Sequence, residues 1–409
     1  MSYPARASSL ADRLSVLPWN RFHTVVVLLF GMGWALDGFE VTLIGNLLGA
    51  LRQRFHLDAE AMSLILAAWF VGLMLGSAGF GQLADHYGRR RVFLASLVLY
   101  GIATLATALA PDLAALLGLR LVAGIGVGAE YSAINAAITE LVPTPSRGRA
   151  AAMVLNFWPL GSLIAALLSW LVLSALPAAL GWRAVFCFGG LIALSTAWFR
   201  RHLPESPRWL ESTGRVAAAE ALVGGIEAGL TRLPVADAAP IRRPARKKQT
   251  AWRMLLRCYS GRLALGALLD FAEAAGYYGL FAFLPLVVLP ALNLAPARLP
   301  LFYIAGSVGG VAGGIAVATV LDRWGRHRTV GFFHLATAVA TVVMAFATAF
   351  GRGAIMVGFA LVNLLATGSW TAANPTFSEL FPTPVRASGI RASGLSLERI
   401  AGEGTVGAG

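Results

Sequence analysis

The chain has 409 residues, of which 57% are hydrophobic and only 13% are charged. The apolar residues form long unbroken runs. Such runs exclude a soluble domain. They also exclude a membrane barrel, whose strands show alternating runs of about ten residues, and they predict a helical multi-pass membrane protein. The formal net charge of +13 does not predict a nucleic-acid partner, because most arginines lie in short loops between apolar runs rather than on one basic face. The two cysteines are too few for a disulfide framework.

The first apolar run, from about residue 22 to 50, contains two acidic residues near its middle, Asp37 and Glu40. An ionisable group at this depth is costly and usually faces a protein interior or a wet cavity. At positions i and i+3 of a helix the two carboxylates point the same way. The alternative is one buried acid, protonated or paired, with the other incidental. Two acids on one face favour a polar pathway.

Nine further apolar runs predict spans at about 62–84, 92–110, 113–141, 149–174, 183–200, 260–290, 300–321, 329–350 and 354–381. A last segment from Ala387 is short and glycine-rich, so we expect about eleven of twelve spans and a chain truncated at its C-terminus. If every run crosses, most of the arginine-rich loops fall on one side. That side should be cytoplasmic, which places the N-terminus and the 201–258 loop there, as in a bacterial inner-membrane protein.

The chain divides into two similar parts around the basic 201–258 segment, which contains the only lysines, Lys247 and Lys248. We predict an N-terminal six-helix half at 1–200, a cytoplasmic linker at 201–258 and a C-terminal half at 259–409 that lacks its last span. Three motifs recur at offsets of roughly 235 residues: Asp37-Gly-Phe-Glu40 as Asp270-Phe-Ala-Glu273, Asp85-His-Tyr-Gly88-Arg89-Arg90 as Asp322-Arg-Trp-Gly325-Arg326-His327, and Glu140-Leu-Val-Pro-Thr-Pro-Ser-Arg147 as Glu379-Leu-Phe-Pro-Thr-Pro-Val-Arg386. Repeated halves with a site at their interface are a common transporter plan.

These residues carry a family resemblance. The run from Gly81 to Arg91, between the second and third predicted spans, resembles the signature of the major facilitator superfamily, as does the stretch from Arg120 to Arg149 around the fourth span. The Pro204-Glu205-Ser-Pro-Arg-Trp-Leu210 segment is similar to a motif that follows the sixth span in sugar porters and metabolite:proton symporters. The resemblance covers nearly the whole chain. It implies an all-α integral membrane fold of two pseudo-symmetric six-helix halves, the second incomplete here.

The recurring loop motifs are interpreted as a latch that holds one conformation, against the alternative of solvated positive-inside turns. Glycines allow a tight turn and close helix approach, and an aspartate at a helix end can pair with arginines or cap a neighbouring helix. The predicted latch residues are Gly81, Asp85, Gly88, Arg89, Arg90, Asp322, Gly325, Arg326, Glu140, Arg147, Glu379 and Arg386.

The subfamily is indicated both by the motifs that this chain shares with other members and by those in which it differs from them. Asn135 lies where sugar porters carry a Pro-x-Tyr motif, and Asp270 lies where they carry a glutamine pair, so a sugar substrate is disfavoured. The glycine-rich fifth-span motif of drug antiporters is not found, so drug efflux is also disfavoured. Asp37-Gly38-Phe39-Glu40 is similar to the Asp-Gly-x-Asp of aromatic-acid:proton symporters, and the run from Glu130 to Asn135 looks like nicotinate-type metabolite:proton symporters.

From these comparisons Asp37 and Glu40 are the predicted proton sites, with Arg120 as their modulator, as the binder of a substrate carboxylate, or as a snorkelling surface arginine. The predicted lining of the substrate cavity is Arg120, Glu130, Asn135, Asp270, Glu273 and Asn374, with Tyr131, Trp158, Tyr277, Tyr278 and Trp370 as aromatic contacts.

We therefore expect a proton-coupled importer of a small organic acid or related metabolite, acting as a monomer in the bilayer. The alternatives are a uniporter, an organic-cation or sugar transporter of the same superfamily, and a non-transporting receptor. Nothing in the sequence offers a nucleophile with its base, a metal-ligand spacing or a phosphate loop, so an enzyme, a metal site and a cofactor are not predicted.

Overall fold

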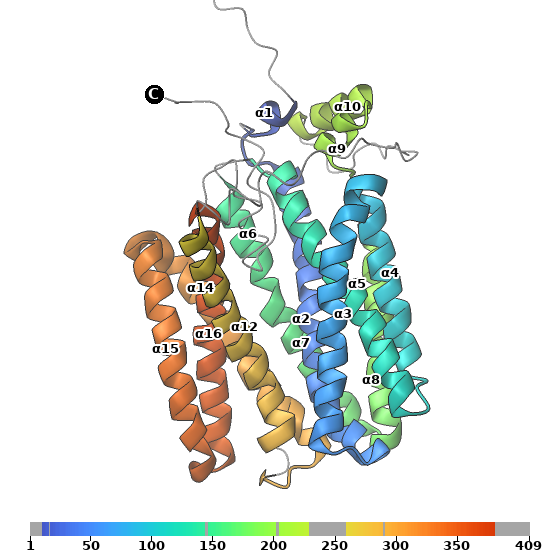
Figure 1. Ribbon diagram of the computed structural model, residues 1–409, viewed down its shortest axis with the longest axis vertical. Coiled ribbons are helices and arrows are strands. Elements are labelled where there is room, and N and C mark those ends of the chain that lie inside the picture. Colours follow the sequence, from blue (N-terminus) through green and yellow to red (C-terminus); the bar gives the residue numbers. More distant parts are fainter. Residues whose placement is uncertain are drawn as a thin grey trace, which may run out of the picture.

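In a computed structural model of the chain, the described residues are 10–15, 17–143, 146–201, 204–228, 259–288 and 291–380. Every regular element in this part of the chain is a helix (Figure 1). The elements are α1 (Leu10–Ser15), α2 (Arg21–Phe55), α3 (Ala59–Tyr87), α4 (Arg89–Thr107), α5 (Leu113–Leu141), α6 (Arg147–Leu155), α7 (Phe157–Ala175), α8 (Ala178–Arg200), α9 (Pro207–Ser212), α10 (Val216–Glu227), α12 (Ser260–Phe283), η2 (Leu284–Val288), η3 (Pro296–Arg298), α14 (Leu299–Trp324), α15 (Arg326–Phe346), η4 (Ala347–Phe350) and α16 (Arg352–Leu380).

Ten candidate spans lie within the described residues, each long and apolar enough to cross a membrane. Each overlaps one of the ten predicted runs, and the all-helical membrane fold is confirmed. The eleventh segment, from Ala387, lies outside the described residues.

Two predicted spans are interrupted, and a proline accounts for each. The run predicted at 149–174 is two helices that meet at Asn156, because Pro159 has no N–H to donate to the carbonyl of Leu155. Pro285 likewise lies in the π-helical turn, Leu284–Val288, that follows α12. It cannot bond to the carbonyl of Phe281, which instead accepts from the hydroxyl of Tyr303 at 2.7 Å.

Small residues let the helices of the first six spans pack backbone to backbone. Gly72 of α3 lies against the carbonyl of Leu121 on α5, and Gly124 of α5 lies against the carbonyl of Trp69 on α3. Gly126, on another face of α5, lies against α4. The glycines of α5 therefore allow close packing against two neighbouring helices at once.

The short helices α1, α9 and α10 gather at one end of the bundle, which we call the linker end (Figure 1). Arg13 of α1 binds Glu227 of α10 through two hydrogen bonds of 2.9 and 2.6 Å. The Asn20 side chain, which caps α2, also donates to the carbonyl of Ile226 at 2.9 Å. These contacts fix the start of α2 to the linker end.

The long helices form two groups, α2 to α8 and α12 to α16. The second group contacts the first mainly where α14 packs against α7. Glycines on α14 face two ways: Gly309 and Gly313 lie against α16, while Gly310 and Gly314 lie against Pro159 and Asn156. A helix with small residues on both sides can be shared by two neighbours at close range. This shared helix joins the two groups.

Candidate functional site

Asp37 and Glu40 lie near the middle of α2, and neither has any exposed surface. The preceding turns of α2 are apolar, and α7 packs closely beside it, with Gly38 against the carbonyl of Trp158. The two carboxylates are therefore enclosed by neighbouring helices of the first six spans, as expected for charged groups that are costly to place in a membrane-spanning helix.

Glu40 is paired with Arg120 of α5, and both side chains are completely buried. The carboxylate also accepts from the hydroxyl of Tyr100 at 3.1 Å. The guanidinium donates to Thr107 at 2.7 Å and lies 4.8 Å from the ring centroid of Phe186. Arg120 thus faces the interior of the first six spans rather than the membrane surface, and its observed partner is a carboxylate of the protein.

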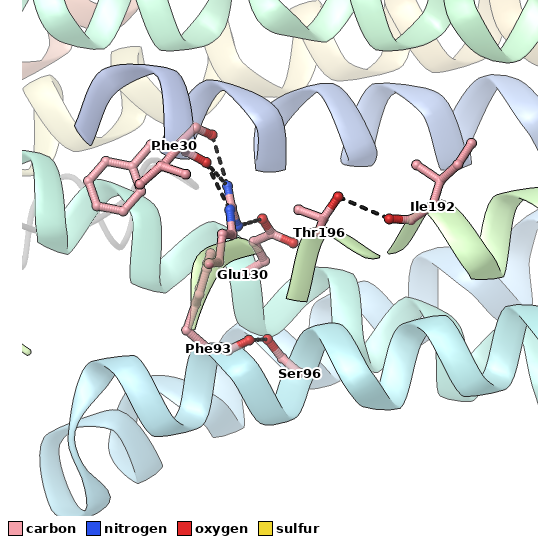
Figure 2. A network of polar contacts seen from close by, with 8 residues as sticks. Phe30, Phe93, Ser96, Glu130, Ile192 and Thr196 are labelled. Atoms are coloured by element: carbon pink, nitrogen blue, oxygen red, sulfur yellow. Dashed lines mark hydrogen bonds and ion pairs between the residues drawn. The ribbon is translucent and has the colours of Figure 1, made fainter. Parts of the chain in front are cut away.

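A second buried ion pair joins Glu130 of α5 to Arg200, the last residue of α8, at 2.5 Å (Figure 2). Arg200 also donates to the backbone carbonyls of Leu29 at 2.8 Å and Phe30 at 3.2 Å, and its guanidinium lies 4.4 Å from the ring centroid of Phe93. A single arginine therefore connects α2, α4, α5 and α8. Sequence reasoning predicted Glu130 but missed Arg200.

Asp37 lies between these two pairs. The charged groups that act on it are Glu130 and Arg200 on one side and Glu40 on the other. Neither of its carboxylate oxygens has a hydrogen-bond partner among the described residues. Since a buried polar group without a partner is rare and costly, this arrangement requires an explanation.

Aromatic rings line the boundary between the two groups of spans. The indole of Trp158 on α7 donates to the hydroxyl of Tyr277 on α12 at 2.8 Å. The ring of Trp34 lies 6.2 Å from Trp158, and Phe281 lies 4.7 Å from Tyr277. Tyr278 makes an edge contact with Phe70 of α3 at 4.7 Å. Such surfaces suit a flat, partly apolar molecule.

An apolar cavity of about 430 Å³ opens near the linker end. It is lined by Trp19, Thr24, Val27, Leu28, Ser146, Met153, Asn156 and Phe157. The lining offers a surface for an apolar ring but no formal counter-charge for an ionised group.

Comparisons with known proteins identify the family. The model of the Major Facilitator Superfamily matches residues 24–402. The chain belongs to this superfamily. It is 32% identical to the niacin transporter NiaP of Acinetobacter baylyi, over 93% of this chain and 85% of that protein. It is 26% identical to the 4-hydroxybenzoate transporter PcaK of Pseudomonas aeruginosa, over 92% of this chain and 83% of that protein.

The fold agrees with this assignment. A partially occluded, inward-open structure of the xylose transporter XylE from E. coli superposes with a TM-score of 0.73, covering 91% of this chain and 88% of that one. The two sequences are 20% identical. As a member of the major facilitator superfamily with transporters as relatives, the protein is a multi-pass membrane transporter of small molecules and not an enzyme.

The superfamily loop motif adopts a defined geometry at Gly88, which has a φ of 95°. Gly325, its counterpart in the second group of spans, has a φ of 77°. Positive φ favours glycine at both positions. A side chain at Gly88 would also meet Glu205, so the turn leaves room for that carboxylate.

Glu205 completes the start of α4, which has no side-chain cap of its own. It accepts from the backbone N–H groups of Arg89 at 2.9 Å and Arg90 at 3.2 Å. Burial raises the pKa of Glu205, although backbone hydrogen bonds from Ser206, Arg90 and Arg89 act against the increase. The Arg90 side chain donates to the carbonyl of Arg201 at 3.1 Å. The motif therefore joins the loop after α3 to the segment after α8.

Of the other predicted residues, Glu273 is buried on α12. Most of the remaining side chains fall outside those that the structure describes: Gly81, Asp85, Asn135, Glu140, Arg147, Asp270, Asp322, Arg326, Asn374 and Glu379. Arg386 lies outside the described residues altogether.

Proposed function

We propose that this transporter imports a small organic acid, one with an aromatic or heteroaromatic ring, together with protons. The observation that carries the proposal is the buried Glu40–Arg120 pair beside Asp37 in the first span. A carboxylate at this depth can exchange a proton when the cavity opens to one side. Alternating access would rock the two halves around a central site.

The ring contacts between the halves support the substrate class. Trp34, Trp158 and Tyr277 present adjacent aromatic surfaces where the two groups of spans meet. Niacin and 4-hydroxybenzoate, the compounds named for two relatives, each contain one ring. Rings of this kind stack favourably on indole and phenol faces.

The remaining parts of the proposal follow from the sequence. The N-terminus and the linker would lie in the cytoplasm, because the arginine-rich loops gather on that side. The chain would work as a monomer, with a six-helix half at 1–200, a linker at 201–258 and a second half from 259. In this orientation the linker end faces the cytoplasm.

The test is an uptake screen with the purified protein in proteoliposomes. Radiolabelled nicotinate, 4-hydroxybenzoate, xylose and carnitine are offered with and without an inwardly directed proton gradient, and empty liposomes correct for passive entry of the acids. We expect accumulation of at least one aromatic acid that depends on the gradient. Uptake that equilibrates without responding to the gradient would indicate a uniporter, and uptake of carnitine or xylose alone would exclude the substrate class.

A further inference from the structure

Five ionisable side chains form a buried group in the first group of spans, which we call the polar column: Arg120, Glu40, Asp37, Glu130 and Arg200. Their exposed fractions are 0%, 0%, 0%, 1% and 0%. Two arginines face three carboxylates, and two of the carboxylates are already paired. Among the described residues no cation is left to pair with a third charged carboxylate, and an unpaired charge is very costly in a buried site. The third group, Asp37, therefore carries a proton in this conformation.

Beyond the proton sites of the proposed function, on which it rests, we propose that Arg200 is a counter-ion shared by Glu130 and Asp37. The proton of Asp37 passes to Glu130, and Arg200 changes partner at the same time. Before the step Asp37 is a neutral acid and Glu130 is a carboxylate paired with Arg200. Afterwards Glu130 is the neutral acid and Asp37 is the paired carboxylate, so protons and charges balance.

The geometry of α2 brings Asp37 to this pair. Gly33 lies four residues before Asp37, so the two share one face of the helix, and helical side chains lean toward the N-terminus. The side chain of Asp37 therefore leans toward the bare backbone at Gly33. A methyl group added at Gly33 would collide with Nη2 of Arg200 and with Oε1 of Glu130. The ion pair occupies the space that the missing side chain leaves.

The surroundings of Arg200 suit a cation that changes partner. The carbonyls of Leu29 and Phe30 and the ring face of Phe93 hold the guanidinium whichever acid is charged. Because these contacts are neutral, they stabilise the cation without preferring either carboxylate. A small shift of the acids, rather than a large movement of the arginine, can then exchange the pairing.

The direction of the step follows from the order of the groups. The titratable and charged groups that face Asp37 are Glu40 on α2, Tyr100 on α4, Glu130 on α5 and Arg200 on α8. Arg200 is the last residue of α8, at the linker end. Transfer from Asp37 to Glu130 thus moves the proton toward that end. Arg200 is a positioning residue for the proton, and it is not a predicted substrate contact.

The test measures protonation directly, in detergent or lipid and without substrate. The infrared band of protonated carboxyl groups is recorded at neutral pH for the wild type and for Asp37→Asn, and their difference identifies the Asp37 band. In Glu130→Gln, Asp37 is the carboxylate that the described residues leave to Arg200, so Asp37 should ionise and its band should be lost. Persistence of the full Asp37 band in Glu130→Gln would overturn the shared counter-ion.

Two further variants guard against a merely structural effect. Arg200→Gln removes the counter-ion that the described part of the chain offers to both acids, so a second protonated-carboxyl band should appear; an unchanged spectrum would contradict the proposal. Arg200→Lys keeps the charge and should retain the wild-type bands. Glu227→Gln, which breaks the exposed pair with Arg13, is the matched control and should leave them unchanged. Because no substrate is used, this result is independent of the uptake screen: absence of any uptake would refute the proposed function alone.

Discussion

Replacing Glu40 by glutamine should destabilise the protein strongly, because it leaves the cation of Arg120 buried without its charged partner. Removal of one member of a buried ion pair costs about 3 to 5 kcal/mol. Arg120 keeps its hydrogen bond of 2.7 Å to Thr107 and its contact with the ring of Phe186, and the new amide oxygen can still accept. We therefore expect the lower limit, about 3 kcal/mol, out of a total of roughly 5 to 15 kcal/mol for a folded domain.

The assay is unfolding in detergent micelles of Glu40→Gln, Arg120→Gln and the double variant. The double variant should be less destabilised than the sum of the two single changes, because it buries no uncompensated charge. Arg13→Gln is the control, since its pair with Glu227 is about one-third exposed, and it should show no measurable change. Wild-type stability of Glu40→Gln, or additive effects in the double variant, would refute the reasoning.

Three further changes test other contacts. Because burial raises the pKa of Glu205, the stability that this group contributes is present at low pH and is lost as pH rises through that pKa. The unfolding temperature of the wild type, relative to that of Glu205→Gln, should therefore fall as pH rises from the pKa of an unfolded glutamate to the raised pKa of Glu205. Parallel profiles for the two proteins would contradict this. Trp158→Phe removes the donor to Tyr277 and should weaken binding of nicotinate measured by calorimetry, whereas unchanged binding would exclude this contact. Glu220→Cys, in a protein without its natural cysteines, should resist an impermeant maleimide in intact cells, and strong labelling would reverse the proposed orientation.

The sequence predicted the fold because hydropathy and repetition are strong signals. Ten apolar runs and three recurring motifs were enough to place the spans and to identify the superfamily. The breaks at Asn156 and near Pro285 were not predicted, since a single proline in a membrane helix is often tolerated as a kink. Whether it ends the helix depends on neighbours such as Tyr303, which takes over a freed carbonyl.

The candidate site was only partly visible in the sequence. Asp37 and Glu40 stand out because acids are rare in apolar runs. Arg200 does not, because it is followed by Arg201 at the end of a span, where arginines are expected for topology alone. Only the packing of α8 against α2 shows that one of the two arginines turns inward and binds Glu130. Gly33, which makes room for this contact, gave no signal that distinguishes it from other glycines.

The central claim is that proton coupling runs through the acids of the first span. It is tested most directly by comparing two transport modes in proteoliposomes, gradient-driven accumulation and substrate counterflow, with a substrate found in the uptake screen. Asp37→Asn and Glu40→Gln keep much of the shape and hydrogen bonding but cannot carry the proton. We predict that both variants lose accumulation and retain counterflow. Accumulation against a substrate gradient by both variants, with normal proton influx, would contradict the account.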